Sequence, residues 1–269
     1  MLAYRLQESY IPYETKIKTL EETINTFKSE DEFFERAFLL ETQFPPGIAF
    51  TNFDGDQPEL LNDFKRNRDL TFFAVLEYTK NNASLEIYKE VYDENTNEIN
   101  VLAGYGMAIN TSNISVFKEQ DVKGYISSVI VHPIYRQKNI ASELLQPILK
   151  KFDSMRTSTF LTTWCNSDNR INYCYYPPIK FWMRNGYEPV DIKFASAILD
   201  GIREMHAREG IKGRNYILIE KEISSLEKLL NNHLDLPKNM RIAILKEYYE
   251  PIGYNENRWD GIIMLRKPK

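Results

Sequence analysis

The sequence is poor in the residues that build disulfide and metal frameworks. It contains two cysteines, Cys165 and Cys174, and three histidines, His132, His206 and His233, in 269 residues. None of these residues has the short spacing of zinc ligands, and two cysteines are too few for a disulfide scaffold. We therefore expect no metal site and an ordinary packed core.

Long apolar runs and dense blocks of like charge are also missing from the sequence. No run approaches the roughly 18 apolar residues of a membrane span, and the first ten residues lack the basic-then-apolar order of a signal peptide. The net charge is -4, from 34 basic and 38 acidic residues, with no block rich in Lys or Arg. We expect a cytoplasmic protein that binds neither membranes nor nucleic acid.

The residues that are present are typical of a folded globular domain, with 43% hydrophobic and 27% charged. Ser29, three residues before Glu32, is the expected N-cap of the second helix. Periodicity predicts two helices within 16–38, and further helices at 60–64, 140–152, 179–184, 192–208, 225–231 and 239–249. Apolar runs between turn residues predict strands at 71–79, 85–92, 99–109, 124–131, 160–164, 216–219 and 262–265. This order predicts an α/β fold with a mixed, mostly antiparallel sheet flanked by helices.

The most informative segment is the strand–turn–helix connection at residues 129–145. Its strand should end before Pro133, which has no backbone donor, and a helix should follow at once. A helix N-terminus leaves several backbone N–H groups without intrahelical partners. The amides of residues 137–142, with Arg136 and Lys138, would therefore suit a pyrophosphate. The alternative is an ordinary connection in which both basic side chains are solvated.

This segment resembles the acetyl-CoA-binding motif of the GNAT (general N-acetyltransferase-related) superfamily. That motif reads Val-x-Pro-x-x-(Arg/Gln)-x-x-(Gly/Ala)-x-(Gly/Ala), and Val131, Pro133, Arg136 and Ala141 match it. Asn139 departs from the motif, because the family usually has Gly there. Asn is the residue next best able to adopt a positive φ, so we expect the turn to be kept.

The resemblance extends downstream of the turn. Residues 181–190 resemble the family's Tyr-x-x-x-Gly-Phe unit, and residues 213–223 resemble its closing strand. The resemblance covers about residues 70–223, which we predict to form the acetyl-CoA-binding core. Residues 1–69 would add N-terminal helices and a cleft loop to the same domain, and residues 224–269 would be a C-terminal extension.

The resemblance implies a splayed sheet, with pantetheine beside strand 124–131 and the pyrophosphate at the turn. An amine would attack the thioester directly, with a strand N–H stabilising the tetrahedral oxyanion. A base would take the ammonium proton, and an acid would protonate the departing thiolate. The implied coenzyme-binding residues are Val129, Ile130, Val131, Arg136, Gln137, Lys138, Asn139, Ile140, Ala141 and Ser142.

The catalytic base is not evident from the sequence. Family members often place a Glu on the motif strand, in the register that Tyr125 or Ser127 occupies here. A water relay past Ser127 is one alternative. The other is a carboxylate from elsewhere in the chain, although such residues are more often solvated: Asp54, Asp56, Asp168 or Glu188.

The family's thiolate-protonating Tyr is replaced by Trp182, whose indole N–H is not a useful acid. Tyr175 lies seven residues earlier and is a candidate catalytic acid. Pro177 and Pro178 would break a helix joining the two residues, and a core or groove-lining Tyr175 is the alternative.

A weak internal echo adds Tyr249 as a second candidate acid. Residues 247–267 repeat the order aromatic, three residues, Gly-Tyr and strand, so that Tyr249 would correspond to Trp182. The echo indicates a partial second GNAT-like unit, an extra hairpin on the sheet, or coincidence. No His is suitably spaced from Cys165 or Cys174, so we interpret both as core or cleft residues.

These observations predict an acetyl-CoA-dependent N-acetyltransferase acting on a primary amine of a small molecule or a peptide N-terminus. The loop at 43–69 and the C-terminal residues would form walls of the acceptor site. A catalytically silent acetyl-CoA-binding or interaction module is the alternative. It is favoured by Asn139, by Trp182 and by the missing carboxylate on the motif strand.

Overall fold

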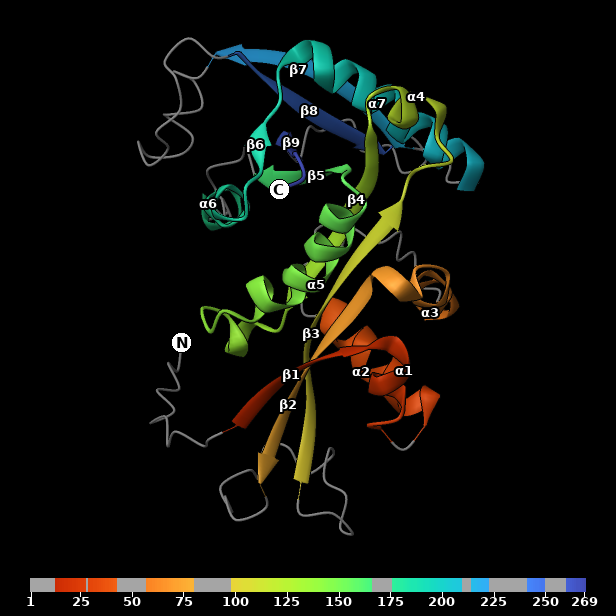
Figure 1. Cartoon of the computed structure of the whole chain (residues 1–269), viewed down its shortest axis with the longest axis vertical. Coiled ribbons are helices and arrows are strands. Elements are labelled where there is room, and N and C mark those ends of the chain that lie inside the picture. The colour runs from red at the N-terminus through yellow and green to blue at the C-terminus, as the bar shows by residue number, and fades with distance from the viewer. Residues whose placement is uncertain are drawn as a thin grey trace. The chain divides into compact units, whose positions relative to one another are not determined.

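A computed structural model describes residues 13–27, 29–42, 57–79, 98–165, 176–209, 214–222, 241–249 and 260–269. The helices are α1 (Leu20–Ile24), α2 (Glu30–Thr42), α3 (Gln57–Arg66), α4 (Ser115–Glu119), α5 (Ile140–Ser154), α6 (Tyr176–Arg184) and α7 (Ile192–Glu209), with short 3₁₀ helices η1 (Arg68–Leu70) and η3 (Pro133–Tyr135). The strands are β1 (Tyr13–Thr19), β2 (Thr71–Thr79), β3 (Glu98–Asn110), β4 (Val122–Val131), β5 (Ser158–Cys165), β6 (Glu188–Pro189), β7 (Arg214–Glu222), β8 (Arg241–Tyr249) and β9 (Asp260–Arg266) (Figure 1).

The described strands form one mixed sheet in the order β1-β2-β3-β4-β5-β9-β8-β7, with β6 paired to β9. β4 and β5 run parallel, in a register that ends at the pair Tyr125 and Phe160. The pairs β1–β2, β2–β3, β5–β9, β6–β9, β7–β8 and β8–β9 are antiparallel. The predicted α/β fold with a mostly antiparallel sheet and flanking helices is therefore confirmed.

The chain divides into two compact units, of which unit 1 comprises residues 1–108 and 128–149. In unit 1 both faces of the sheet are buried, because successive side chains of a strand point to opposite sides. On β2, Phe73 and Val75 pack with side chains of α1, α2 and α3, whereas Ala74 and Leu76 pack with side chains of α5. The first half of α5 is thereby fixed against the sheet.

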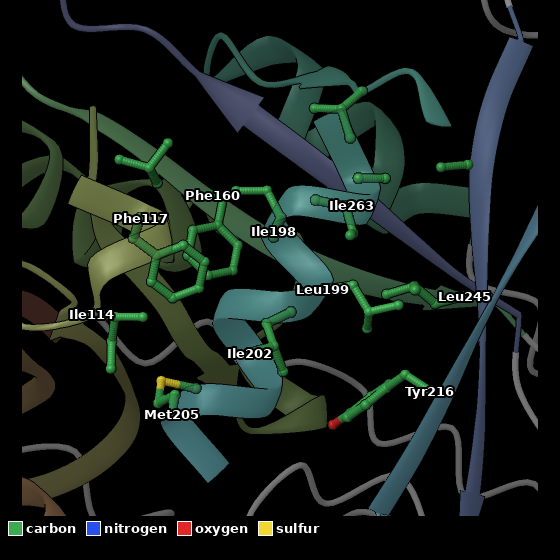
Figure 2. Close-up of a cluster of buried hydrophobic side chains, with 14 residues drawn as sticks. Ile114, Phe117, Phe160, Ile198, Leu199, Ile202, Met205, Tyr216, Leu245 and Ile263 are labelled. Atoms are coloured by element: carbon green, nitrogen blue, oxygen red, sulfur yellow. The ribbon is translucent and has the colours of Figure 1, made fainter. Parts of the chain in front are cut away.

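Unit 2 comprises residues 109–127 and 150–269 and has its own core. The apolar side of α7, including Ile198 and Ile202, packs against side chains of α4, β5, β8 and β9 (Figure 2). Phe117 of α4 and Phe160 of β5 lie there with ring centroids 4.9 Å apart. Side chains of β5 and β9, which are paired neighbours in the sheet, are part of this core.

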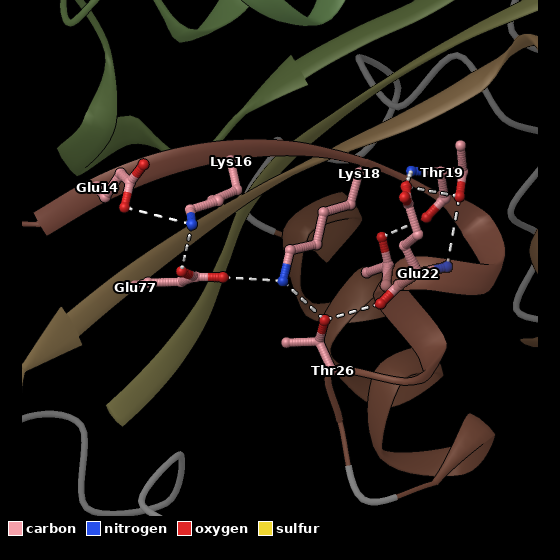
Figure 3. A network of polar contacts seen from close by, with 8 residues as sticks. Glu14, Lys16, Lys18, Thr19, Glu22, Thr26 and Glu77 are labelled. Atoms are coloured by element: carbon pink, nitrogen blue, oxygen red, sulfur yellow. Dashed lines mark hydrogen bonds and ion pairs between the residues drawn. The ribbon is translucent and has the colours of Figure 1, made fainter. Parts of the chain in front are cut away.

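The structure corrects the predicted start of the first helix. Residues 16–19 belong to β1, so the prediction of a helix from residue 16 was wrong; α1 begins only at Leu20, after a capping box between Thr19 and Glu22. The polar and apolar side chains alternate along β1 with the period of a strand. Lys16 and Lys18 extend to Glu77 of β2, with N···O distances of 3.2 and 2.9 Å (Figure 3).

Two predicted helix boundaries are confirmed. The Glu32 N–H donates to the Ser29 hydroxyl at 3.1 Å, as the predicted N-cap of α2 requires. Helix α6 ends at Arg184, and Gly186, just after this end, has φ of 85°. The Tyr187 N–H donates to the Trp182 carbonyl at 3.1 Å, and the Gly186 N–H donates to the Met183 carbonyl at 3.0 Å. This is a Schellman motif, for which Gly is the preferred residue.

The other predicted elements divide into three groups. Six predicted strands are confirmed by β2, β3, β4, β5, β7 and β9, which contain residues 71–79, 99–109, 124–131, 160–164, 216–219 and 262–265. Four predicted helices are confirmed by α3, α5, α6 and α7, which contain residues 60–64, 140–152, 179–184 and 192–208. The strand predicted at 85–92 and the helix predicted at 225–231 lie outside the described residues.

The helix predicted at residues 239–249 was wrong, because β8 occupies residues 241–249. Ile242, Ala243, Ile244 and Leu245 are consecutive and all buried. Such a run fits a strand enclosed on both faces better than an amphipathic helix, and pairing with β7 and β9 decides between them. Residues 224–269, predicted as an extension, therefore supply β8 and β9, and β9 lies directly beside β5.

Candidate functional site

The turn between β4 and α5 begins where Pro133 ends the strand. β4 stops at Val131, and the His132 N–H still donates to the Ala103 carbonyl of β3 at 2.8 Å. A 3₁₀ turn follows, closed by the Tyr135 N–H, which donates to the His132 carbonyl at 2.9 Å. The predicted strand end at Pro133 is confirmed, and the chain enters α5 four residues after Arg136.

Two residues of the turn adopt the left-handed conformation. Gln137 has φ of 66° and Asn139 has φ of 65°. The expectation that Asn139 takes a positive φ in place of the motif glycine is confirmed. Asn tolerates this region better than most residues, because its short polar side chain can bond locally.

The turn presents a series of backbone donors. Within the described part of the chain, the amides of residues 137–141 donate no hydrogen bond, whereas the Ser142 and Glu143 N–H groups donate to the Asn139 carbonyl at 3.0 and 3.1 Å. Ser142, predicted to offer its amide to a ligand, therefore uses it in the first turn of α5. The five other amides lie at the N-terminus of a 15-residue helix, where the helix dipole favours an anion.

Near its end, β4 directs the backbone N–H and C=O groups of alternate residues to opposite sides. The His132 N–H bonds toward β3, and the Ile130 carbonyl also points there, since a Cβ added to Gly104 of β3 would lie 2.3 Å from its oxygen. Backbone groups alternate sides along a strand. The N–H and C=O of Val129 and Val131 therefore point away from β3, on the side that could pair with an extended ligand.

The basic side chains of the turn differ in their placement. Arg136 is exposed, and its Nε donates to the Val131 carbonyl at 3.3 Å. The Lys138 ammonium lies over the rings of Tyr13 and Tyr135. Burial, and to a smaller extent the Arg136 charge, lowers the pKa of His132, so the imidazole adds no positive charge to the turn at neutral pH.

Only some of the predicted catalytic residues lie within the described part of the chain. Tyr175 lies outside the described residues, as do the carboxylate candidates Asp54, Asp56 and Asp168. Tyr249 is the last residue of strand β8, whereas Trp182 lies in helix α6, so the two segments of the internal echo do not share a secondary structure.

Several remaining candidates lie in unit 2. Glu188 is exposed on β6, and Ser127 is half-buried on β4. Tyr125 is stacked on Phe160, with ring centroids 4.8 Å apart. Cys165 ends β5, and Cys174 lies outside the described residues.

Tyr187, which follows Gly186, is a structural tyrosine. Its ring lies 5.4 Å from Trp182, and its hydroxyl is 2.8 Å from the Thr159 hydroxyl in the core. Burial raises the pKa of Tyr187 well above its ordinary value. The hydroxyl is therefore a poor proton donor for a thiolate.

The segment that contains this turn matches a known protein family. Residues 55–187 match the model of the acetyltransferase (GNAT) family. The GNAT match begins in the N-terminal segment, includes the whole turn, and ends at Tyr187, one residue after the glycine that closes α6. The family resemblance predicted from the sequence is confirmed.

Two solved structures are similar to this chain at low sequence identity. The ribosomal-protein-S18-alanine N-acetyltransferase from Escherichia coli shares 10% identity at a TM-score of 0.41, with 94% of each chain covered. An acetyltransferase of the GNAT family from Staphylococcus aureus Mu50 shares 12% identity at a TM-score of 0.43, with 95% of this chain and 100% of that chain covered. No curated protein matches the sequence.

Two further searches of the described residues concern metals and membranes. No group of three or more His, Cys, Asp or Glu side chains among them is placed to hold a metal ion. None of the described helices is both long and apolar enough to cross a bilayer.

One residue near the turn was missed by sequence reasoning. Tyr13 belongs to β1, a strand that was not predicted, and its ring lies 6.4 Å from that of Tyr135. The alternating pattern of residues 13–19 is the signal that could have identified this strand.

Proposed function

We propose that the chain is an acetyl-CoA-dependent N-acetyltransferase that moves an acetyl group to a primary amine of a small molecule or a peptide N-terminus. The observation that carries the proposal is a run of five backbone N–H groups, at residues 137–141, that donate no hydrogen bond within the described part of the chain. These groups lie just before and at the start of α5, inside the segment that matches the GNAT model. Backbone donors at a helix N-terminus suit a pyrophosphate.

In this proposal the coenzyme lies along β4 and across the turn. Pantetheine pairs with the main chain of Val129 and Val131, which faces away from β3, as an added strand would. The pyrophosphate accepts hydrogen bonds from the amides of residues 137–141, and Arg136 adds a positive charge beside them.

The chemistry proposed is a direct transfer. The neutral amine nitrogen attacks the thioester carbonyl carbon, the new C–N bond forms, and the carbonyl oxygen becomes an oxyanion that a β4 N–H stabilises. The C–S bond then breaks, the thiolate collects a proton, and the nitrogen loses one to a base. Tyr175 and Tyr249 are retained as candidate acids, since the pKa of Tyr matches a departing thiolate and Trp182 cannot donate usefully.

Calorimetry on variants of the turn tests coenzyme binding. Arg136→Ala should weaken acetyl-CoA binding by about 10- to 100-fold, the loss expected for a hydrogen bond to a charged group. Ala141→Phe should abolish binding by filling the turn. Lys150→Ala removes one exposed charge near the far end of α5 and should bind as the wild type does. Unchanged binding in the first two variants would remove the basis for the site.

A panel of amines, with thiol release and mass detection of the acetylated product, tests the transfer. The expected result is an amine-dependent product, and about 10²-fold or greater loss of turnover in Tyr175→Phe or Tyr249→Phe with coenzyme affinity kept. If both variants turn over as fast as the wild type, neither tyrosine is the catalytic acid, and both have structural roles.

A catalytically silent coenzyme-binding module is the second candidate function. It is favoured by Trp182 in helix α6 and by the buried Tyr187 hydroxyl, neither of which is a useful acid. Tight coenzyme binding without turnover on any amine of the panel would favour this module over the enzyme.

A further inference from the structure

The Lys138 side chain has an unusual environment for a cation in an anion-binding turn. Its Nζ lies 5.5 Å from the centroid of the Tyr13 ring and 5.9 Å from that of Tyr135. The two rings meet edge-on at 6.4 Å. One ammonium therefore contacts Tyr135, which lies in the same turn, and Tyr13 of strand β1, which is more than 100 residues away in the sequence.

Both rings are themselves held in place. Tyr135 is 4% exposed and belongs to the buried cluster formed by β2, β3 and the start of α5. Tyr13 packs against the same cluster, and its ring centroid lies 5.2 Å from that of Tyr78 on β2. A cation over the face of a fixed aromatic ring is attracted by the ring quadrupole. Lys138 thus joins the last part of the turn, which follows the 3₁₀ helix η3, to β1.

We propose that Lys138 is a positioning residue, which anchors the turn to β1 through Tyr13 and Tyr135 and leaves phosphate contact to the turn amides and Arg136. The coenzyme part of this inference rests on the proposed function. It differs from the expectation that Lys138 itself binds the pyrophosphate, because it assigns the ammonium to the two rings instead.

Proton NMR of the free protein tests the anchor without any coenzyme. A methylene next to the ammonium that lies over two ring faces resonates upfield, and Lys138→Arg identifies the resonance by removing it. We expect the upfield shift in the wild type and in Tyr13→Phe, which keeps the ring, and its reduction in Tyr13→Leu. An unshifted Lys138 resonance in the free wild-type protein would overturn the inference.

Saturation with coenzyme A then separates positioning from direct phosphate contact. If Lys138 is a positioning residue, its upfield shift persists in the complex. If the shift disappears on saturation, Lys138 has moved to the ligand and the inference is wrong. A failure of coenzyme A to bind would contradict the proposed function, while the spectrum of the free protein would still decide whether the anchor exists.

Affinities of a double-mutant cycle give a second, independent readout. Lys138→Met and Tyr13→Leu should each weaken coenzyme A binding by about fivefold, the value of one exposed cation–π contact, and the double variant should be no weaker than either. Lys138→Arg and Tyr13→Phe should retain the wild-type affinity. Lys150→Met is the matched control for loss of one positive charge. Additive losses in the double variant would show that Lys138 acts without Tyr13.

Discussion

Backbone conformation at single residues shapes the turn between β4 and α5. Gln137 and Asn139 both have positive φ, and the Asn139 carbonyl accepts the first two hydrogen bonds of α5. The turn contains these two left-handed residues without having a glycine. Asn139 thus fills the conformational role of the motif glycine, although it adds a side chain that a ligand must accommodate.

Substitution at Asn139 should follow the backbone requirement. Asn139→Val should cost about 1–2 kcal/mol of stability, because a β-branched residue is strained in the left-handed region, and it should weaken coenzyme A binding. Asn139→Gly, the matched control, should be as stable as the wild type and bind at least as tightly. Thermal unfolding and calorimetry measure both. A Val variant with wild-type stability and affinity would contradict the role assigned to the conformation.

At the scale of elements, the approach of β3 to β4 sets the direction of the β4 main chain. A Cβ on Gly104 would lie 2.3 Å from the Ile130 backbone oxygen, which cannot move without separating the two strands. A Cβ on Gly106 would lie no closer than 3.3 Å, with the flexible end of the Ile148 side chain as its nearest neighbour. A side chain at position 104 would therefore collide with the backbone of β4, whereas one at position 106 would first meet a side chain that can move.

Gly104→Ala should therefore destabilise the protein by about 1–3 kcal/mol, as overpacking does, and should weaken coenzyme A binding by displacing β4. Gly106→Ala should cost less than about 1 kcal/mol, because the contact is with a side chain that can adjust. Both variants lose a strand glycine, so the effect on the unfolded chain is matched. Equal stability of the two variants in urea would contradict this account.

The end of α5 is joined to β9 by an ion pair. Both terminal nitrogens of Arg266 donate to the Asp153 carboxylate at 2.7 Å, and the Arg266 side chain is 3% exposed. The hydrogen bonds from Arg266 hold the pKa of Asp153 below its ordinary value. A lowered carboxyl pKa means that the stabilisation is present above the unfolded-state value and is lost as pH falls through the folded-state value.

Asp153→Asn should accordingly lower stability by about 3–5 kcal/mol at pH 7, because it leaves a buried guanidinium without its charge partner. The difference from the wild type should shrink below about pH 4, the ordinary range of an Asp pKa, as the wild-type carboxyl takes up its proton. Asp200→Asn removes an exposed partner of Arg203 and should cost less than about 1 kcal/mol. If the stability difference between Asp153→Asn and the wild type does not change with pH, the ion pair with Arg266 does not stabilise the protein as described.

On the scale of the whole molecule, the C-terminal strands complete unit 2. β9 pairs with β5 over seven residues, from Thr159 opposite Arg266 to Cys165 opposite Asp260. β8 lies between β9 and β7, and its residues Ala243 and Leu245 belong to the same buried cluster as Phe160. Strands β8 and β9 are therefore built into the sheet.

Truncation after residue 223 should abolish folding of unit 2. Removing β8 and β9 leaves β5 and β7 without these partners, exposes the cluster around α7 and unpairs Asp153. The truncated chain should be insoluble or lack the cooperative transition of the full chain in calorimetry. A soluble truncated chain that unfolds at the wild-type temperature would instead show that residues 224–269 are an appended extension.

How far the sequence predicts this structure depends on where the decisive contacts lie. The β4–α5 turn was predictable, because Pro133, the basic residues and the helical periodicity after them act locally. Strand β8 was not, since distant partners decide it: its apolar run becomes a strand between β7 and β9. The alternation along residues 13–19 indicates a strand, but it does not show that the partner of this strand is β2. The contact of the Lys138 ammonium with the Tyr13 ring could not be predicted either, because the two residues are far apart in the sequence.

The central claim is that the undonated amides of residues 137–141 hold the coenzyme pyrophosphate. A titration of the ¹⁵N-labelled full chain with acetyl-CoA, followed by amide NMR, tests it most directly. We predict that these five amide protons shift downfield together, in a saturable way, and that Arg136→Ala weakens the response. Binding of acetyl-CoA that leaves these five amides unshifted, or no binding at all, would contradict the account.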